Sequence, residues 1–220
     1  HLLISMCEGL TIANPKGGEN LPGVAESWQI SEDGKTYTFF LNKAAKWSNG
    51  DQVVAEDFVW SWERILTPSL GSQYPDMLYY LEGAADFHQS KISDFSLVGV
   101  KAVNDHELEV KLKNPTPFFI KLLSHYSTYP VHKKTVLQHG TIDDRNGQWT
   151  RPGNFVCNGP MNLKTWELNK QIIVEKNPLY WDAQNVRLNQ IIDYPVSNES
   201  TEDRMFRAGQ LHVTNVVPLE

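Results

Sequence analysis

The chain has 220 residues, of which 40% are hydrophobic and 21% charged, a composition typical of a globular protein rather than a disordered one. Its formal net charge of −6 argues against nucleic acid or an anionic membrane as a partner, because both select a basic surface. No stretch approaches the roughly 20 apolar residues of a transmembrane helix. The sequence opens at His1 without Met or a signal peptide, and we expect it to be a piece of a longer protein.

The first third of the chain carries the clearest secondary-structure signals. Residues 1–10 have apolar positions spaced as in a short helix. Residues 29–41 read as a hairpin that turns at 31–34, where Gly34 can take a positive φ. Residues 55–66 are predicted to form a helix that ends before Pro68, with one apolar stripe made by Phe58, Val59, Trp62, Ile65 and Leu66.

Short strands and helices follow without a strict βαβ order. Ser200 is predicted to begin the last helix through a capping box with Asp203, and Gly209 to close it. The segment 141–154 is predicted to be a polar surface loop. We predict strands over 98–103, 107–112, 161–167, 171–175, 191–196 and 211–217, and helices over 118–123 and 135–139. The predicted fold class is therefore α/β with mixed sheets (α+β).

The cysteines and histidines give weak signals for chemistry. Cys7 and Cys157 could form a disulfide in an oxidising compartment, but a single pair so far apart favours two unpaired thiols. His125, His132 and His139 recur every seven residues, yet Pro130 interrupts any shared helix. We therefore predict no metal site and no cofactor.

The carboxylates and tryptophans also favour structural roles. Adjacent acids do not show the facing geometry that glycoside hydrolysis needs, so Asp143–Asp144 and Glu202–Asp203 are predicted to serve helix starts or solvated faces. A sugar-stacking platform is less favoured than core packing for the tryptophans at positions 28, 47, 60 and 62. Neither a Gly-x-Ser-x-Gly elbow nor a phosphate-binding glycine-rich loop occurs in the sequence.

An ordered series of motifs resembles the oligopeptide-binding branch of the extracytoplasmic solute-binding proteins, family 5. The strongest are LPGVAESW (21–28), SEDGKTYTFFL (31–41), KWSNGD (46–51) and AEDFVWSWER (55–64). NGP (158–160), KNPLYWD (176–182) and RAGQL (207–211) continue the series. Each motif alone is weak, but they run through nearly the whole chain in the order that the family shows.

The resemblance implies a periplasmic-binding-protein-like architecture, in which two lobes joined by a hinge enclose the ligand. On the family pattern, residues 1–8 and 133–220 form a discontinuous first lobe, residues 9–132 form an inserted smaller domain, and the second lobe is absent. Such proteins are receptor subunits of ATP-driven importers and are not enzymes. The implied partners are short peptides and membrane permease subunits, at a periplasmic or extracytoplasmic location with an optional lipid anchor.

The resemblance also implies where a peptide would lie. It places Tyr74 near the ligand on the inserted domain, and Val213, Thr214 and Asn215 at the wall beside the hinge. Peptide capture without sequence preference needs backbone hydrogen bonds of the kind made in strand addition and wet side-chain pockets. Without the resemblance, Tyr74 would read as a tyrosine packed in a loop.

Two alternatives stay open at this point. The same scaffold could bind a cell-wall peptide, a nickel complex, haem or an oligosaccharide. A protein of another class, an extracellular hydrolase, would need a nucleophile or an acid pair that the sequence does not display. We also expect this piece of the protein to self-associate through apolar surface that faced the absent lobe.

Overall fold

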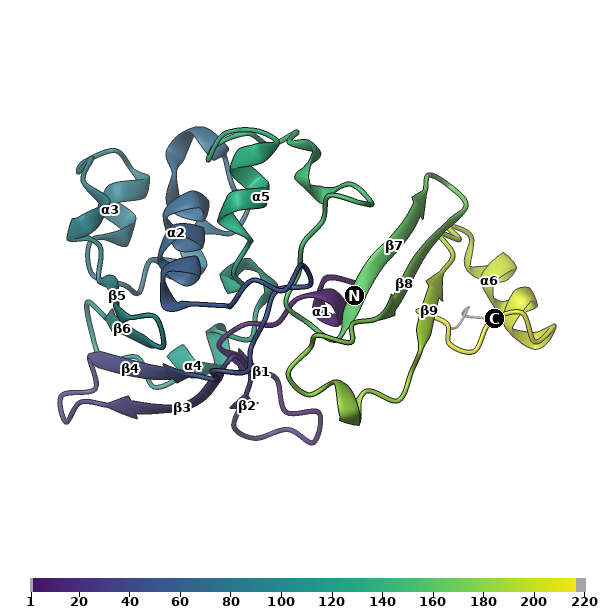
Figure 1. Ribbon diagram of the computed structural model, residues 1–220, viewed down its shortest axis with the longest axis horizontal. Helices are drawn as coiled ribbons and strands as arrows, with labels where there is room; N and C mark the ends of the chain where they lie inside the picture. The colour runs from purple at the N-terminus through teal and green to yellow at the C-terminus, as the bar shows by residue number, and fades with distance from the viewer. Residues whose placement is uncertain (1, 217–220) are drawn as a thin grey trace.

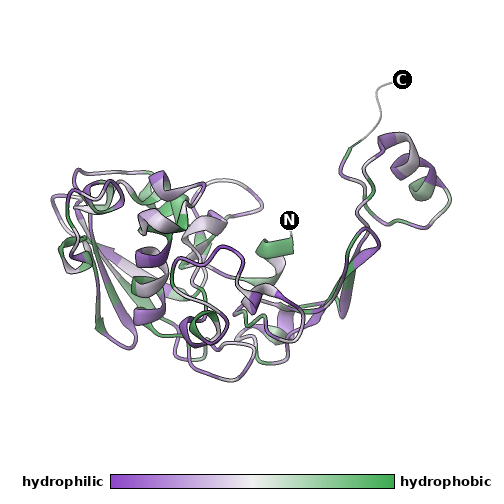
Figure 2. Cartoon of the chain, turned by 90° about the horizontal axis from the view of Figure 1, so that it is seen from above, coloured by the Kyte–Doolittle hydropathy of each residue, from purple (hydrophilic) through white to green (hydrophobic). Residues whose placement is uncertain are grey.

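A computed structural model describes residues 2–216 and shows the predicted mixture of helices and strands (Figure 1). The sheets are not mixed as predicted, because every pair of neighbouring strands among these residues is antiparallel. The larger body is built on an antiparallel sheet in the order β3-β4-β6-β5. A second antiparallel sheet, in the order β7-β8-β9, leads away from it towards α6 (Figures 1 and 2). No helix among residues 2–216 is long and apolar enough to cross a membrane.

The strands are β1 (Thr11–Ile12), β2 (Leu21–Pro22), β3 (Ala25–Ile30), β4 (Thr36–Leu41), β5 (Val100–Asn104), β6 (Glu107–Lys111), β7 (Met161–Glu167), β8 (Gln171–Lys176) and β9 (Gln190–Asp193). The α-helices are α1 (Leu2–Met6), α2 (Ala55–Leu66), α3 (Ala84–His88), α4 (Phe119–Leu122), α5 (Lys133–Gln138) and α6 (Glu199–Arg207). Short 3-10 turns are η1 (Pro68–Leu70), η2 (Pro75–Leu78), η3 (Phe95–Leu97), η4 (Tyr126–Thr128), η5 (Gln148–Thr150) and η6 (Ala183–Asn185).

Helix α2 has the predicted bounds and buries the predicted stripe. Phe58, Trp62 and Leu66 are fully buried against the sheet, and each such side chain contributes roughly 1.5–3 kcal/mol to folding. Val54 cannot cap the helix with its side chain, but its backbone N–H donates to Asp57 Oδ2 at 2.9 Å. A carboxylate in the first turn of the helix therefore accepts the backbone hydrogen bond at its start.

The predicted hairpin is confirmed as β3–β4, and the predicted strands near residues 98–103 and 107–112 pair as β5 and β6. The β3–β4 turn carries Gly34 at a φ of +67°, a conformation that L side chains rarely adopt. Residues of β4 and β6 alternate between the core and the outer face, as a half-buried strand requires. Of the tryptophans, those at 47, 60 and 62 are buried and the one at 28 packs against the core, which contradicts a sugar-stacking platform.

Three predictions at the C-terminal end are wrong, and the first is the strand over 191–196, because β9 ends at Asp193. Helix α6 begins at Glu199, because the side chain of Asn198 accepts from Thr201 N at 2.9 Å and supplies the cap instead of Ser200. Gly209 follows that helix at a φ of +73°, as predicted. Residues 211–216 do not form the predicted strand; in the described chain β9 pairs only with β8, and this segment does not pair with the free edge of β9. Val217 lies outside the described residues.

The apolar side chains gather in two clusters. The larger draws its buried members from Leu10 to Leu123 and fills the space between the sheet β3-β4-β6-β5 and the helices. The smaller contains Met6, Cys157, Met161 and Val174. The assignment of residues 1–8 and 133–220 to one lobe and 9–132 to an inserted domain stays a prediction.

Candidate ligand-binding site

Tyr74 lies at the start of η2 and is part of an exposed aromatic cluster. Its ring meets His125 edge-on with centroids 5.4 Å apart, and meets Tyr126 at 5.9 Å with an interplanar angle of 88°. Tyr74 is 37% exposed. An interaction with the Tyr74 hydroxyl raises the pKa of the Tyr126 phenol. Three rings with polar edges thus face solvent together.

Local structure explains how the cluster forms. Pro75 opens η2 and suits its first position, because its φ is fixed and its missing N–H is not needed there. His125 caps η4, and its Nδ1 lies 2.8 Å from Ser127 Oγ. Because η2 packs against η4, Tyr74 meets residues about 50 positions away in sequence. Sequence reasoning missed His125 and Tyr126, because only the folded chain brings them to Tyr74.

The predicted hinge-side residues lie at the other end of the chain. Val213 is 79% exposed, and the Asn215 backbone N–H donates to Glu202 Oε1 at 2.8 Å. Val213 and Asn215 line an open pocket of about 420 Å³ together with side chains of α1, β9 and α6. Thr214 is half-buried and does not line this pocket. The aromatic cluster shares no lining residue with the pocket, so residues 2–216 do not bring the two predicted halves of the site together.

A second open pocket, of about 430 Å³, is almost entirely apolar. It lies between α1, the η5 segment and the β7–β8 hairpin. Its lining residues are Leu2, Leu3, Met6, Trp149, Thr150, Phe155, Leu163, Trp166 and Ile172. Its apolar lining makes it a surface suited to apolar contact.

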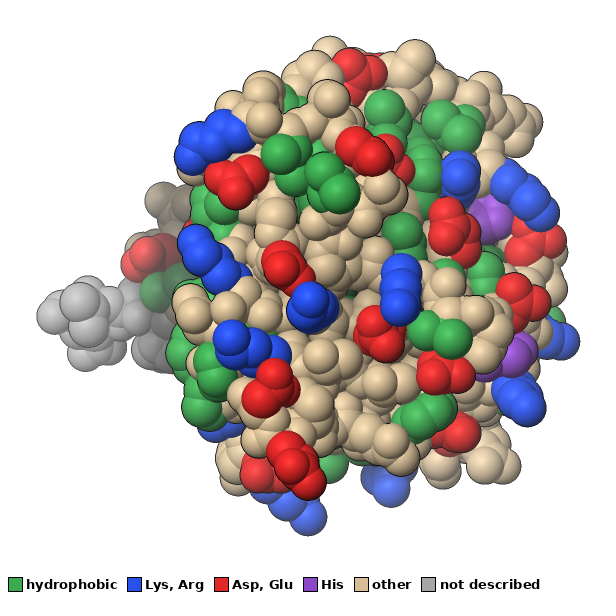
Figure 3. All heavy atoms as spheres, turned by 90° about the vertical axis from the view of Figure 1, so that its left-hand side faces the viewer, with side chains coloured by type: hydrophobic (Ala, Val, Ile, Leu, Met, Phe, Trp, Pro, Cys, Tyr) green, Lys and Arg blue, Asp and Glu red, His purple; other side chains and the backbone are tan. Residues whose placement is uncertain are grey.

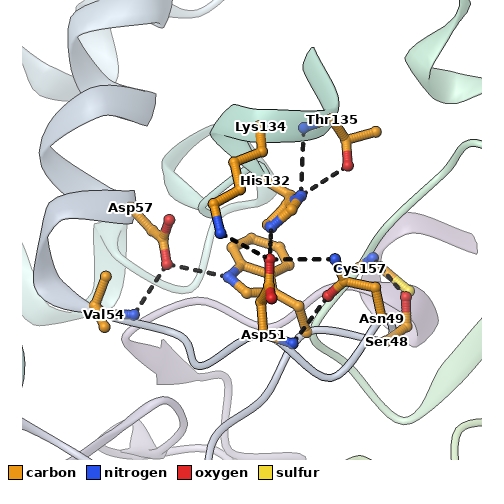
Figure 4. Close-up of polar contacts among 10 residues, drawn as sticks. Ser48, Asn49, Asp51, Val54, Asp57, His132, Lys134, Thr135 and Cys157 are labelled. Carbon is orange, nitrogen blue, oxygen red and sulfur yellow. Dashed lines mark hydrogen bonds and ion pairs between the residues drawn. The ribbon is translucent and has the colours of Figure 1, made fainter. Parts of the chain in front are cut away.

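Asp51, His132 and Thr135 form the hydrogen-bonded chain that most resembles a catalytic triad (Figure 4). His132 Nε2 lies 3.0 Å from Asp51 Oδ2, and His132 Nδ1 lies 2.7 Å from Thr135 Oγ1. The Thr135 backbone N–H also donates to Nδ1, so Nδ1 faces α5 while Nε2 faces the Asp51 carboxylate. His132 and Thr135 are only 5% and 7% exposed, so the protein covers both side chains.

The same chain of contacts has a structural purpose. His132 caps α5 and packs edge-on against Trp47, with centroids 5.1 Å apart. Hydrogen bonds from Lys134 and His132 hold the pKa of Asp51 below its usual range. Trp47 Nε1 in turn donates to Asp57 Oδ2 at 3.0 Å. The cluster therefore fastens the loop after β4 to both α2 and α5 (Figure 4).

The carboxyl group of Glu8 is buried inside the protein. Trp181 Nε1 donates to its Oε1 at 2.8 Å and the Tyr180 hydroxyl donates to its Oε2. Burial raises the pKa of Glu8 to about 7, against the opposing effect of these two donors. At 3% exposure the carboxyl is sealed from any substrate. Sequence reasoning missed this cluster, because Glu8 lies more than 170 residues from Tyr180 and Trp181.

The adjacent acids and the histidines take local roles. Asp143 accepts from Ser69 and Thr141 at 2.8 and 2.7 Å, and Asp203 pairs with Arg207 at 2.7 Å. Within residues 2–216, no three His, Cys, Asp or Glu side chains are grouped to hold a metal ion. On the face that Figure 3 shows, acidic and basic side chains alternate and neither forms a continuous patch.

Comparison with known proteins defines the class of this fold. A family model described as "Bacterial extracellular solute-binding proteins, family 5 Middle" matches residues 20–220. The structure resembles that of Haemophilus influenzae OppA solved in complex with the peptide RPPGFSPFR, with a TM-score of 0.89 and 35% identity over 96% of this chain and 40% of that one. The fold is thus one part of an extracytoplasmic solute-binding protein. Within that class, the chain belongs to the bacterial extracellular solute-binding proteins of family 5.

Relatives agree with this assignment and show how much of such a protein is present. The periplasmic oligopeptide-binding protein OppA of Escherichia coli (strain K12) is 41% identical over 218 residues, which are 97% of this chain and 38% of that protein. The oligopeptide-binding protein OppA of Bacillus subtilis (strain 168) is 42% identical over 206 residues, 93% of this chain and 36% of the relative. The chain spans less than two fifths of the length of these relatives. Membership in the family gives it an extracytoplasmic, periplasmic-type location.

Proposed function

We propose that this chain is part of the peptide-receiving subunit of an ATP-driven oligopeptide importer. The observation that carries the proposal is a sequence identity of 41% and 42% to two oligopeptide-binding proteins across nearly the whole chain. A structural match to a relative solved with a bound peptide supports it. The whole receptor would enclose an extended peptide between two lobes and deliver it to permease subunits. It performs no chemistry, in keeping with the sealed carboxyl and imidazole groups described above.

We propose that Tyr74 contacts the ligand and that His125 and Tyr126 complete the surface it presents. Aromatic rings with polar edges offer large contact area at a low cost in side-chain entropy and can also hydrogen-bond a peptide backbone. Val213, Thr214 and Asn215 are proposed as the second contact region, at the wall beside the hinge. Closure of the lobes would then be a population shift driven by contacts that only the closed state makes.

Isothermal titration of the full-length protein with defined di- to pentapeptides tests the role of Tyr74. Tyr74→Ala should weaken binding roughly 10-fold or more, corresponding to about 1.4 kcal/mol. Tyr80→Ala is the matched control, because Tyr80 is 38% exposed and packs edge-on against Phe118, outside the cluster. Equal affinities for the wild type and the Tyr74→Ala variant would remove Tyr74 from the site and leave the receptor assignment standing.

Native mass spectrometry of the full-length protein purified from its own compartment tests the receptor assignment itself. A ladder of bound masses spaced as short peptides supports low-selectivity peptide capture. A single discrete mass would instead assign the scaffold to another solute, such as a cell-wall peptide, a nickel complex, haem or an oligosaccharide. Turnover of a peptide or glycan that a single side-chain change abolishes would replace the receptor proposal with a hydrolase.

For the 220-residue chain alone, we propose self-association through the apolar pocket between α1, η5 and the β7–β8 hairpin. That pocket holds two tryptophans and several aliphatic side chains with almost no polar lining, and such surface favours association in water. Size-exclusion chromatography should show a concentration-dependent shift towards larger species. Replacement of the half-exposed Trp166 by Glu should return a monomer, and a clean wild-type monomer at high concentration would contradict the proposal.

A further inference from the structure

The two cysteines lie in chain segments that hydrogen bonds hold side by side. Gly159 N donates to Met6 O at 2.9 Å. The Asn158 side chain accepts from Glu8 N at 3.0 Å and donates to Glu8 O at 2.9 Å. Cys7 lies between Met6 and Glu8 in the first segment. Cys157 directly precedes Asn158 and Gly159 in the second. Segments 150 residues apart in sequence therefore lie side by side at this place.

The side chains of the two cysteines also meet the same surroundings. Cys157 is a buried member of the cluster formed with Met6, Met161 and Val174, and Cys7 packs against that cluster. Gly159 permits the close approach, because a Cβ there would lie 2.8 Å from Cys7 N. Backbones joined by a hydrogen bond, as those of Met6 and Gly159 are, lie about 5 Å apart, and a disulfide spans roughly 4.4–6.8 Å between Cα atoms.

We propose that Cys7 and Cys157, which are thiols in this structure, are a disulfide-forming pair in the oxidising environment outside the cytoplasm. A small-molecule or protein disulfide is the oxidant. One cysteine thiolate attacks it, forms a mixed disulfide and releases one thiol. The second cysteine thiolate then attacks the mixed disulfide at the first cysteine and releases the other thiol. Two cysteines are oxidised, one disulfide is reduced to two thiols, and two protons pass from the cysteines to the released thiolates.

Burial determines when this exchange can occur. It raises the pKa of Cys157 to about 11 and that of Cys7 well above its usual value, and only the thiolate attacks a disulfide. The folded, reduced protein is therefore slow to react, and the bond forms while the chain folds. The disulfide would link the segment that leads into β1 to the segment that leads into β7. Both segments contribute to the smaller hydrophobic cluster.

Peptide mapping of the full-length protein secreted into an oxidising periplasm, alkylated without reduction, tests the proposal. The tryptic peptides ending at Lys16 and Lys164 should be recovered as one cross-linked species, 2 mass units lighter than their sum. Their alkylated forms should be absent. In the Cys157→Ala variant, the Cys7 peptide should be recovered fully alkylated. Recovery of both cysteines as alkylated peptides from the secreted wild type would overturn the proposal.

Refolding supplies a second measurement that does not depend on secretion. Reduced, unfolded full-length protein is returned to native conditions in a buffer of oxidised and reduced glutathione. The cross-linked peptides should appear together with the native near-ultraviolet circular dichroism. Subsequent reduction should lower the Tm by several degrees in the wild type and leave the Cys157→Ala variant unchanged. A native spectrum regained with glutathione adducts or free thiols at both positions would overturn the pairing.

Discussion

The buried carboxyl of Glu8 should make the stability of this protein depend on pH in a way that one substitution removes. Glu8→Gln replaces the carboxyl with a neutral group of the same shape. The amide oxygen can still accept from Trp181 Nε1, which lies 2.8 Å from Glu8 Oε1 in the wild type. The amide nitrogen can donate to the Tyr180 oxygen, since that hydroxyl can rotate to accept. The variant therefore mimics the protonated wild type.

The sign and size follow from the pKa of Glu8, which burial raises from 4.5 to about 7. Between these values the folded state binds more protons than the unfolded state, so the free energy of unfolding falls as the pH rises. The loss begins above the unfolded pKa and is complete above about pH 7. A shift of this size corresponds to about 3 kcal/mol. Because Glu8 is almost fully buried, little of this is screened by solvent.

Urea unfolding of the full-length wild type and the Glu8→Gln variant at pH 4.5, 6, 7 and 8 measures the effect. Comparing the two proteins at each pH cancels the titration of all other groups. The variant should match the wild type within about 1 kcal/mol at pH 4.5 and exceed it by about 3 kcal/mol at pH 8. For the control variant Glu32→Gln, in the exposed β3–β4 turn, the free energy of unfolding plotted against pH should run parallel to that of the wild type. Parallel curves for Glu8→Gln as well would refute the reasoning.

Two further substitutions, each with a control, test other parts of the structure by urea unfolding. His132→Ala removes the cap of α5 and the bond to a carboxylate, and should lower the free energy of unfolding by about 2–4 kcal/mol. Lys134→Ala, at an exposed ion pair, should lower it by under about 1 kcal/mol. Similar losses for the two variants would contradict the role of the imidazole. Gly159→Ala places a Cβ 2.6 Å from Met6 backbone atoms and should cost at least about 2 kcal/mol. Gly17→Ala, with a φ of +79° in open space, should cost only about 1 kcal/mol, and a larger loss there than at Gly159 would refute the steric argument.

The elements that sequence predicted well are those whose signals are local. Helix α2 has an apolar stripe and a proline just beyond its end, and both act within a few residues. The β3–β4 hairpin depends on one glycine that takes a positive φ. The segment 211–216 shows the opposite case: its alternating side chains suit a strand, but a strand also needs a neighbouring ladder that sequence alone does not guarantee. Its Asn215 N–H bonds to Glu202 instead.

The candidate site was less predictable, because its contacts join distant parts of the chain. Tyr74 was found only through a resemblance between motifs, and its ring partners follow from the packing of η2 on η4. The sequence could not reveal that Glu8 is sealed beneath Tyr180 and Trp181. Burial sets the pKa of a carboxyl, and burial is a property of the fold.

Polar contacts that bridge the chain converge where the two hydrophobic clusters meet. Asn158 bonds both backbone groups of Glu8, and Ser48 exchanges two hydrogen bonds with the Cys157 backbone, at 2.7 and 3.2 Å. Apolar burial has no preferred direction, whereas hydrogen bonds weaken steeply when misaligned. These contacts therefore fix the orientation of the smaller cluster relative to the larger body. Apolar burial alone would not specify that orientation. The receptor proposed above would need such a rigid part, because binding energy spent on deforming a lobe is lost from the closure itself.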